Sequence, residues 1–437
     1  MITQLKNQET VKYLQEKLIT NIPFWVAAAL AAVISVFYNY LFKFCEDWAL
    51  KHASSPWLLL TAPLALLASF LMGHFLSKEA LGSGIPQVMA AMELSTTNNK
   101  FLDKLLSVPM LLVKIFGSCI CVLGGGVSGR EGPTLQVSAA IFYQMTKYWP
   151  KKLPAPQLPA MMLAGGAAGL ASAFNTPLGG IVFAIEELAK THISLVRTAV
   201  FQAVIIAGIM SQFFLGNYLY FGNSSFDAIT ARVIFQTIFI AVVIGAISGL
   251  FAEGLYRVGK WRAQKTFSEK IFITLFFGLL LSLTIWLCGP STIGAGKSVI
   301  LSSLQNPDQT LAAEVPASRI LGNFFTYSAG VIGGVFAPAL ASGATLAHWL
   351  SQNLGFSNFK LMAFVGMVAF LTGVTRSPFT SFVLVLEMGD SHEIILYLML
   401  ASMIANVAAR LVAKKSFYEQ VCHDLIKKVE ESSSPRA

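Results

Sequence analysis

Two stretches that repeat each other decide the fold: AGGAAGLASAFNTPLGGIVFAIE at residues 164–186 and VGMVAFLTGVTRSPFTSFVLVLE at residues 365–387. They align without a gap, so that Pro177 falls on Pro378 and Glu186 falls on Glu387. Both are filled with small and apolar residues, and each carries its proline at a position suited to the first turn of a helix. A unit that recurs in this way predicts a chain built from two homologous halves.

Shorter matches extend the repeat toward the N-terminus. GREGP at residues 129–133 corresponds to GVFAP at residues 334–338, and GSG at residues 82–84 corresponds to GAG at residues 294–296. The sequence therefore predicts one half at residues 22–216 and a second half at residues 231–414. Residues 217–230 would link them.

The composition places both halves in a membrane. Of the 437 residues, 55% are hydrophobic and 12% are charged, whereas soluble domains carry roughly 25% charged residues. Charge-free runs at residues 18–42, 233–252, 271–296 and 394–409 approach or exceed the roughly 20 residues that cross a hydrocarbon core. Because a segment that faces lipid must satisfy its own backbone groups, we expect an all-α polytopic membrane protein.

The basic residues set the expected orientation. The net charge is +9, but the lysines and arginines lie beside apolar runs, which favours the positive-inside rule over nucleic-acid binding. Residues 1–21, predicted as an amphipathic helix, and the tail at residues 415–437 would then be cytoplasmic. The linker at residues 217–230 has no lysine or arginine and would lie outside.

That orientation makes the two halves opposite in direction. If the first half starts inside and ends outside, it crosses an odd number of times, and the second half must run the other way. Such inverted repeats are common in secondary transporters, which bind their substrate where interrupted helices of both halves meet. Many apolar pieces here are short and bounded by glycine or proline, so we expect tilted and broken helices.

Two of the glycine motifs suit an anion. In GSGIP, at residues 82–86, glycines allow backbone N–H groups to approach a ligand, Pro86 suits a first helical turn, and the Ser83 hydroxyl can donate. The start of a helix attracts negative charge through its free N–H groups and its dipole. GVFAP, at residues 334–338, offers backbone donors only. For each motif, a plain helix cap remains the alternative interpretation.

GREGP places a carboxylate, Glu131, inside an apolar region. Ionisable groups at membrane depth are costly and are therefore candidates for function. When ionised, Glu131 could fill an anion site as a tethered anion, and when protonated it could swing away, which would couple proton and anion occupancy. The alternative is a structural ion pair of Glu131 with Arg130 or Lys114.

Two further carboxylates, Glu186 and Glu187, end the repeated stretch of the first half. We expect both near a membrane face that water can reach. Glu186 matches Glu387 in the second half, which favours a structural role in each half. Glu187 corresponds to Met388, so a role specific to one half, such as proton transfer, is the better interpretation for it.

With GSGIP, GREGP and GVFAP in this order inside two repeated halves, the chain resembles the CLC family of chloride channels and chloride/proton antiporters from about residue 22 to residue 425. The resemblance implies a homodimer with one anion pathway in each subunit. It implies a chloride-binding set made of Ser83, Gly84, Ile85, Arg130, Gly132, Val335, Phe336 and Tyr418.

The resemblance also implies individual roles. The hydroxyls of Ser83 and Tyr418 would coordinate a central anion, although Tyr418 on the sequence alone would be an interfacial aromatic residue. Glu131 would be the external gate and proton acceptor. Glu187 matches the internal proton-transfer glutamate of many antiporters, which favours exchange over an uncoupled channel, the second candidate. Serine at position 83 is associated with chloride, whereas proline there is linked to nitrate.

Other functional classes find little support in the residues. The stretch at residues 291–298 resembles a phosphate-binding loop, but it has Ser291 where the pattern needs glycine. The histidines are scattered and form no HExxH pair, so we expect no enzyme, metal site, cofactor or nucleotide. The chain ends soon after Tyr418, and we expect no cytoplasmic nucleotide-binding domains. We expect a multi-pass protein of the inner membrane.

Overall fold

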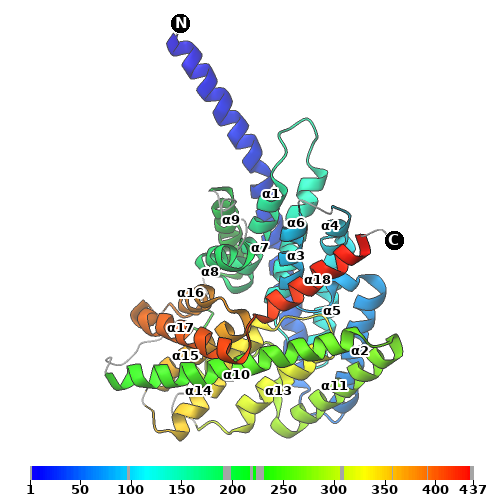
Figure 1. Ribbon diagram of the computed structural model, residues 1–437, viewed down its shortest axis with the longest axis vertical. Coiled ribbons are helices and arrows are strands. Elements are labelled where there is room, and N and C mark those ends of the chain that lie inside the picture. The colour runs from blue at the N-terminus through cyan, green and yellow to red at the C-terminus, as the bar shows by residue number, and fades with distance from the viewer. Residues whose placement is uncertain are drawn as a thin grey trace.

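The computed structural model describes residues 2–95, 99–189, 198–216, 220–222, 231–305, 310–356, 358–390 and 392–433. Within these ranges the regular elements are helices, and the β pairing consists of two isolated bridges (Figure 1). The helices of the first half are α1 (Ile2–Lys51), α2 (Leu58–Leu76), α3 (Ile85–Leu94), α4 (Asn99–Leu105), α5 (Val108–Leu123), α6 (Glu131–Tyr148), α7 (Leu158–Phe174), α8 (Pro177–Phe183) and α9 (Thr198–Leu215). The second half contains α10 (Ala231–Ala263), α11 (Phe267–Cys288), α12 (Lys297–Gln305), α13 (Glu314–Ser328), α14 (Phe336–Asn353), α15 (Phe359–Thr375), α16 (Pro378–Gly389), α17 (Ile395–Val412) and α18 (Phe417–Ser433).

Several helices can cross a membrane. Among the described residues, six helical segments have the length and the composition of a membrane span: Leu18–Lys51, Leu58–Leu76, Phe101–Leu123, Ala231–Ala263, Phe267–Cys288 and His392–Val412. The four charge-free runs of the sequence fall on four of them. The run at residues 271–296 extends beyond its helix, because α11 ends at Cys288, directly before Gly289, where φ is 79°. The protein is therefore a multi-span membrane protein, as predicted.

The repeat is visible in matched helices. The helices α6 and α14 have 18 residues each, and α7 and α15 have 17 each. Both α7 and α15 end in a left-handed residue, Asn175 with φ 59° and Arg376 with φ 63°. Such a residue turns the chain sharply at a helix end, and a proline helix, α8 or α16, follows at once.

Reciprocal contacts relate the two halves by a local two-fold axis. Gly129 and Gly334, which occupy equivalent positions in the repeat, exchange both backbone hydrogen bonds, at 2.8 and 2.9 Å, in an antiparallel bridge. Two identical units that meet at their own symmetry axis make this kind of self-complementary contact. The two halves therefore meet at the GREGP and GVFAP motifs.

A second reciprocal contact involves the glutamates that end the repeated stretches. Glu186 accepts hydrogen bonds from the backbone N–H groups of Phe379, at 3.1 Å, and Thr380, at 2.6 Å, in the first turn of α16. Glu387 accepts from Leu178, at 3.1 Å, and Gly179, at 2.8 Å, in the first turn of α8. Each half thus caps a helix of the other half, and the structural role predicted for Glu186 is confirmed.

The ends of the chain differ from the sequence expectation. The segment predicted as a separate helix at residues 1–21 runs without a break into the first span, and α1 projects beyond the other helices (Figure 1). Pro23 lies inside α1, where a proline removes only one backbone donor and tends to kink rather than stop a long apolar helix. The linker predicted at residues 217–230 lies outside the described residues, except for residues 220–222.

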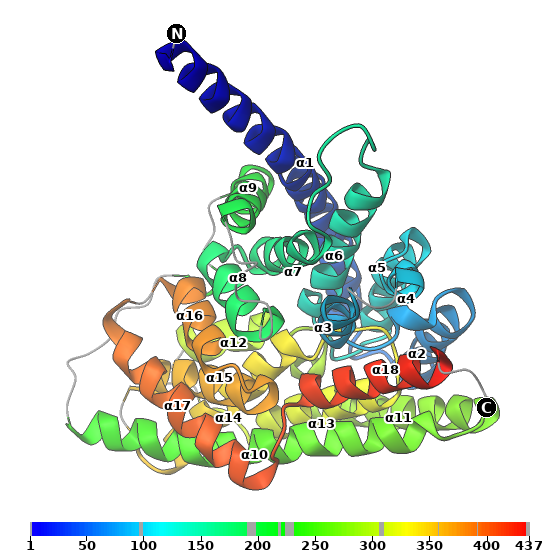
Figure 2. The ribbon, with the colours of Figure 1, turned by 45° about the horizontal axis from the view of Figure 1, so that its top comes forward.

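The C-terminal segment is packed and helical, although it was expected as a tail. Helix α18 lies against α3 and α10 (Figure 2). Its apolar residues Phe417, Tyr418 and Cys422 are buried, which explains why a segment with a polar outer face is held in place. Residues 434–437 lie outside the described residues.

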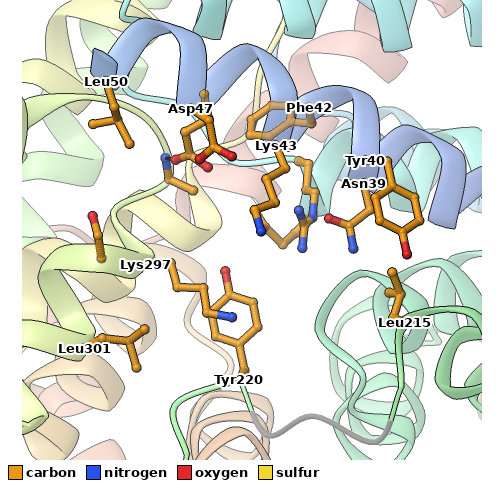
Figure 3. A pocket seen from close by; sticks show the side chains of 15 residues that line it. Asn39, Tyr40, Phe42, Lys43, Asp47, Leu50, Leu215, Tyr220, Lys297 and Leu301 are labelled. Carbon is orange, nitrogen blue, oxygen red and sulfur yellow. Dashed lines mark hydrogen bonds between the residues drawn. The ribbon is translucent and has the colours of Figure 1, made fainter. Parts of the chain in front are cut away.

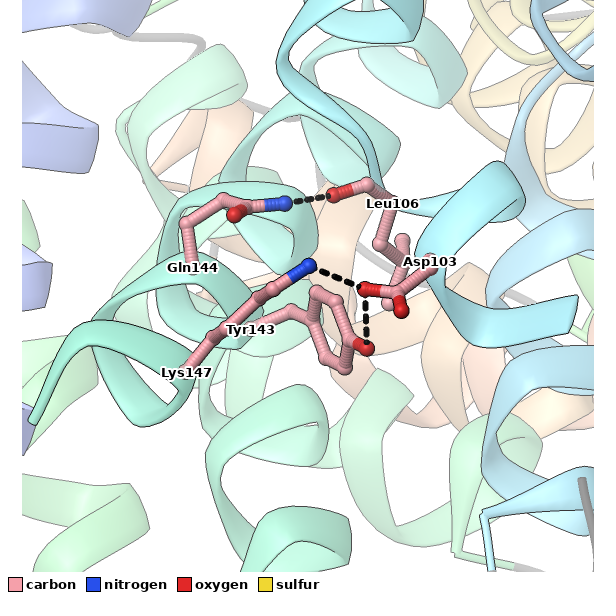
Figure 4. A network of polar contacts seen from close by, with 5 residues as sticks. All are labelled: Asp103, Leu106, Tyr143, Gln144 and Lys147. Atoms are coloured by element: carbon pink, nitrogen blue, oxygen red, sulfur yellow. Dashed lines mark hydrogen bonds and ion pairs between the residues drawn. The ribbon is translucent and has the colours of Figure 1, made fainter. Parts of the chain in front are cut away.

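A polar network fixes the end of α6. Asp103 of α4 accepts hydrogen bonds from Lys147, at 2.6 Å, and from the Tyr143 hydroxyl, at 2.9 Å (Figure 4). At the next residue after Tyr143, the Gln144 amide donates to the Leu106 carbonyl at 2.6 Å. These contacts hold the C-terminal part of α6 and so help to position its N-terminal residue, Glu131.

We expect that Glu186→Ala and Glu387→Ala each destabilise the protein by about 1 kcal/mol, the typical effect of losing a helix cap. The reason is that each substitution leaves backbone N–H groups of the opposite half without their acceptor. Thermal unfolding of the purified protein in detergent measures the effect. Glu393→Gln, at an exposed position, is the control, and unchanged melting temperatures in both alanine variants would contradict the reciprocal capping.

Candidate functional site

Backbone bonds tie three glycine loops into one junction. The Gly82 N–H donates to the Val331 carbonyl at 3.0 Å, and the Gly333 N–H donates to the Gly82 carbonyl at 3.2 Å. The bridge between Gly129 and Gly334 completes the connection. Because α3, α6 and α14 begin directly after these loops, the positive ends of three helices converge there. We call this convergence the junction.

Glycine is required where the loops touch. A Cβ atom on Gly132 would lie 2.5 Å from the Ser83 hydroxyl oxygen and 2.6 Å from the Ser83 carbonyl oxygen. On Gly84, where φ is 106°, it would lie 2.6 Å from the Gly132 carbonyl oxygen. Any side chain at these two positions would separate α3 from α6. The glycines of GSGIP and GREGP therefore serve close approach, as their motifs predict.

A buried cation holds the loop that contains Ser83. The Lys114 ammonium, on α5, donates to the carbonyls of Ala80, at 2.9 Å, and Gly82, at 2.8 Å. In the described part of the chain it forms no ion pair with Glu131. The alternative interpretation of Glu131 as the partner of Lys114 is therefore wrong. The neighbouring Arg130 donates to the Ala173 carbonyl at 3.5 Å and is partly exposed.

Glu131 lies at the first position of α6, with 1% of its surface exposed. Its carboxylate interacts with its own backbone N–H and with that of Ala337, in the first turn of α14. The Oε2 atom has no hydrogen-bond partner among the described residues. The carboxylate thus occupies a position where helix ends favour negative charge.

The hydroxyls of Ser83 and Tyr418 lie on the other side of the junction. Their residues are 1% and 0% exposed, and the two groups face each other. Neither oxygen has a hydrogen-bond partner within the described ranges. Two buried hydroxyls without partners are unusual, and together they could donate to one small anion. The burial of Tyr418 excludes the interpretation as an interfacial aromatic residue.

The remaining predicted anion-site residues share this place. They belong to the first turns of α3, α6 and α14 or to the loops before them, and they are buried: Gly84, Ile85, Gly132, Val335 and Phe336. Arg130 differs, because it is partly exposed toward a cavity. The structure therefore brings together the eight residues that the family resemblance implies for chloride binding.

A cavity of about 440 Å³ reaches the junction from the side of Glu131. Residues of α1, Arg130, Glu131, Tyr220 and Lys297 line it, and we call it the Glu131 cavity. Figure 3 shows Lys43, Tyr220 and Lys297 extending into it from different elements. Three basic side chains, those of Lys43, Arg130 and Lys297, line it together with three carboxylates, those of Glu46, Asp47 and Glu131.

A second cavity, of about 390 Å³, lies between α10, α13 and α18. We call it the Tyr327 cavity, because Tyr327 lines it and also reaches the junction. The Tyr327 hydroxyl lies beside the backbone N–H of Ser83 and close to Gly82. Lys260, Lys427 and Lys428 line this cavity too. Two cavities that each contain basic side chains therefore approach the junction by different routes.

Glu187 is buried, although water access was expected for it. It is 1% exposed, and its Oε2 atom accepts a hydrogen bond from the Ser377 hydroxyl at 2.5 Å. The reason for the difference is local: residues Ala184–Leu188 form a π-helical turn, which shifts the helix register and directs Glu187 inward. Tyr418 interacts electrostatically with both Glu131 and Glu187, so it lies near both carboxylates.

Several residues of the site escaped sequence reasoning. Tyr327 carries no motif, Lys297 belongs only to the stretch that resembles a phosphate-binding loop, and Glu46 of α1 lies beside Asp47 near the end of a long apolar run. Only the position of a charged residue inside or beside an apolar segment could have drawn attention to Glu46 and Lys297.

Comparisons with known proteins place the chain among anion transport proteins. The family described as voltage gated chloride channel matches residues 64–410. The H(+)/Cl(−) exchange transporter ClcA of Cronobacter sakazakii is 29% identical over 440 residues, which cover 94% of this chain and 91% of that protein. ClcA of Yersinia pestis is 28% identical over 439 residues, or 93% and 88% of the two chains.

Solved structures share the fold. A slow cyanobacterial Cl−/H+ antiporter superposes with a TM-score of 0.80 at 20% identity, over 94% of this chain and 99% of that chain. A CLC-type fluoride/proton antiporter gives a TM-score of 0.77 at 20% identity, over 92% and 97%. At this identity the likeness concerns the fold alone, and it agrees with the predicted inverted repeat of broken helices.

Proposed function

Because the chain belongs to the voltage gated chloride channel family, we propose that it exchanges chloride for protons across the inner membrane, as a transporter and not as an enzyme. The observation that carries the proposal is the position of Glu131. A titratable carboxylate interacts with the backbone N–H of Ala337 in the first turn of α14, where a chloride ion would also bind. Proton and anion would therefore compete through one side chain.

The anion is held by partial positive charges and not by a full ion pair. The Ser83 and Tyr418 hydroxyls would donate to a chloride between them, together with backbone N–H groups at Val335 and Phe336. Such donors stabilise an anion through the helix ends without binding it so strongly that it cannot leave. The convergence of three helix starts supports this arrangement.

Glu131 would act as gate and proton acceptor in one cycle. Ionised, it competes with chloride for the N–H groups at the start of α14. Protonated, it loses its attraction to them, turns toward the Glu131 cavity, and leaves the position to an anion. Since a proton must arrive for the anion to pass, the two movements are coupled.

Glu187 would pass protons to and from the other side. Its carboxylate is buried and accepts a hydrogen bond from Ser377, and Tyr418 interacts electrostatically with both Glu187 and Glu131. A buried ionisable group of this kind in a membrane protein often belongs to a proton route. Protons and anions would thus share the outer part of the pathway and separate near Tyr418.

The basic residues suggest the orientation. Lys260, Lys427 and Lys428 surround the Tyr327 cavity, and the positive-inside rule would place it at the cytoplasm with both chain termini. The Glu131 cavity would then open outside, and residues 217–230 would form an external linker between the halves. We further propose a homodimer in the lipid bilayer, as the family resemblance implies, with no cofactor, metal, nucleotide or nucleic-acid partner.

An uncoupled chloride channel of the same fold is the second candidate, and the family's description as a channel favours it. The two candidates differ in one measurable property. In liposomes, a chloride gradient drives proton movement through an exchanger and leaves the pH unchanged with a channel. We expect protons to move in the direction opposite to the chloride flow in vesicles that contain the wild-type protein.

We expect Glu131→Ala to abolish proton movement while chloride flux continues, because the variant has no titratable group at the gate. Paired chloride and pH electrodes on reconstituted vesicles measure both fluxes. Glu393→Gln serves as the control and should behave as wild type. Chloride-driven proton movement that persists in Glu131→Ala would rule out the role of this residue.

Glu187→Gln should reduce proton flux by about 100-fold, the lower part of the range for a positioned proton-transfer group. Chloride flux should fall much less, because Glu187 is not among the groups proposed to donate to the anion. The same electrodes test this variant. An equal loss of both fluxes would point to a structural role instead.

Tyr418→Phe should weaken chloride binding by roughly tenfold, as expected for a lost hydrogen bond to a charged partner. The fold should tolerate it, because the hydroxyl has no partner among the described residues. Calorimetric titration of chloride into detergent-solubilised protein measures the affinity, with Tyr397→Phe as a matched control at another buried tyrosine. Unchanged affinity in Tyr418→Phe would remove Tyr418 from the anion site.

A further inference from the structure

The second half contains a close copy of the loop that carries Ser83. The glycines of the two loops have similar backbones, with φ of 76° at Gly82 and 70° at Gly294, and of 106° at Gly84 and 86° at Gly296. Each loop follows a single 3₁₀ turn and precedes a short helix, α3 or α12. The resemblance of residues 291–298 to a phosphate loop is therefore explained by the repeat.

A buried cation holds each loop in the same way. Arg319 of α13 donates to the carbonyls of Thr292, at 2.9 Å, Ile293, at 3.0 Å, and Gly294, at 3.1 Å. Lys114 of α5 holds the Ser83 loop through its carbonyls, and both cations are fully buried. The second loop thus has the same arrangement as the first: its carbonyl oxygens point toward a buried cation, and the Ala295 N–H points away from it.

The two loops differ in what their backbone N–H groups meet. The Ser83 N–H lies beside the neutral hydroxyl of Tyr327. The Ala295 N–H, its counterpart, donates at 2.7 Å to the carboxylate of Glu46, which comes from α1, 249 positions away in the chain. A carboxylate therefore already occupies the backbone donor of the second loop.

This carboxylate faces the same cavity as Glu131. Glu46, Ala295 and Lys297 line the Glu131 cavity together with Arg130. The Lys297 ammonium lies 4.3 Å from the centre of the Tyr220 ring, and Arg130 interacts electrostatically with Glu46. A small anion at the position of the Glu46 carboxylate would accept from the Ala295 N–H and would interact electrostatically with Arg130 and Lys297.

A purely structural role for Glu46, as the counter-ion of Arg319, is the competing explanation. The repeat argues against it. In the part of the chain that the structure describes, Lys114 forms no ion pair, and carbonyl oxygens alone hold it. A buried cation at this point of the fold can thus be held without a carboxylate.

We propose that Glu46 is a second tethered anion: its carboxylate occupies an outer halide subsite formed by the Ala295 N–H, Arg130 and Lys297, and competes there with anions that enter the Glu131 cavity. The choice of chloride as the competing anion rests on the proposed function. Glu46 would thereby set how strongly the outer cavity binds chloride before the anion reaches Glu131.

Two variants of Glu46 and one matched control test the proposal. Glu46→Ala and Glu46→Gln remove the charge from the subsite, and Asp47→Asn removes the same charge from the same cavity without touching Ala295. Halide affinity of the purified full chain is measured by calorimetry in halide-free buffer. Crystals soaked in bromide, which is visible by its anomalous scattering, locate the ion.

We expect halide affinity to rise roughly tenfold in Glu46→Ala, the effect of freeing a charge-assisted hydrogen-bond donor. A bromide ion should lie within hydrogen-bond distance of the Ala295 nitrogen in that variant and not in Asp47→Asn. Glu46→Gln, which keeps the side-chain volume, should show a smaller gain in the same direction.

Three outcomes would overturn the proposal. An equal gain in Asp47→Asn would show a general effect of net charge, and no gain in either Glu46 variant would show that no halide competes there. Loss of folding in both Glu46 variants, detected by gel filtration while Asp47→Asn stays folded, would show that Glu46 is a structural counter-ion of Arg319. Binding is measured without transport, so absence of chloride flux in vesicles would contradict the proposed exchange and leave this subsite standing.

Discussion

The structure depends on the pair of backbone hydrogen bonds between Gly129 and Gly334. Through them the starts of α6 and α14 meet at the local two-fold axis. The loop that contains Gly82 joins the same junction through its bridge to Ile332. Helices that begin inside a membrane protein leave N–H groups without partners, which is costly in lipid. In this protein several such helix starts face one small volume. An anion or a carboxylate there can accept hydrogen bonds from their free N–H groups.

Buried cations make this junction possible. Lys114 and Arg319 gather the carbonyl oxygens of the loops before α3 and α12, so that the N–H groups of the same loops point the other way. Burying an unpaired cation is expensive, and several carbonyl bonds offset that expense. The positive charge behind each loop also raises the attraction of its N–H side for anions, so one side chain shapes the loop and strengthens its electrostatic field.

Much of the fold could be predicted from the sequence, because local sequence patterns indicate it. The gapless repeat and the motifs GSGIP, GREGP and GVFAP predict the paired halves and the residues that meet at the junction. Long-range contacts leave weaker traces. Nothing in the local pattern shows that Tyr418 starts a helix that folds back, that a π-helical turn buries Glu187, or that Glu46 reaches a loop 249 positions away. Each of these depends on tertiary packing.

The placement of Tyr418 in the first turn of α18 has a mechanical consequence. The hydroxyl at the centre of the molecule is attached to the end of a rigid rod of 17 residues, whose far end lies near the C-terminus at the surface. A rod transmits a tilt over its whole length. Whatever binds to the surface end of α18 therefore acts directly on the position of the Tyr418 hydroxyl, and the C-terminal helix is a means of adjusting it.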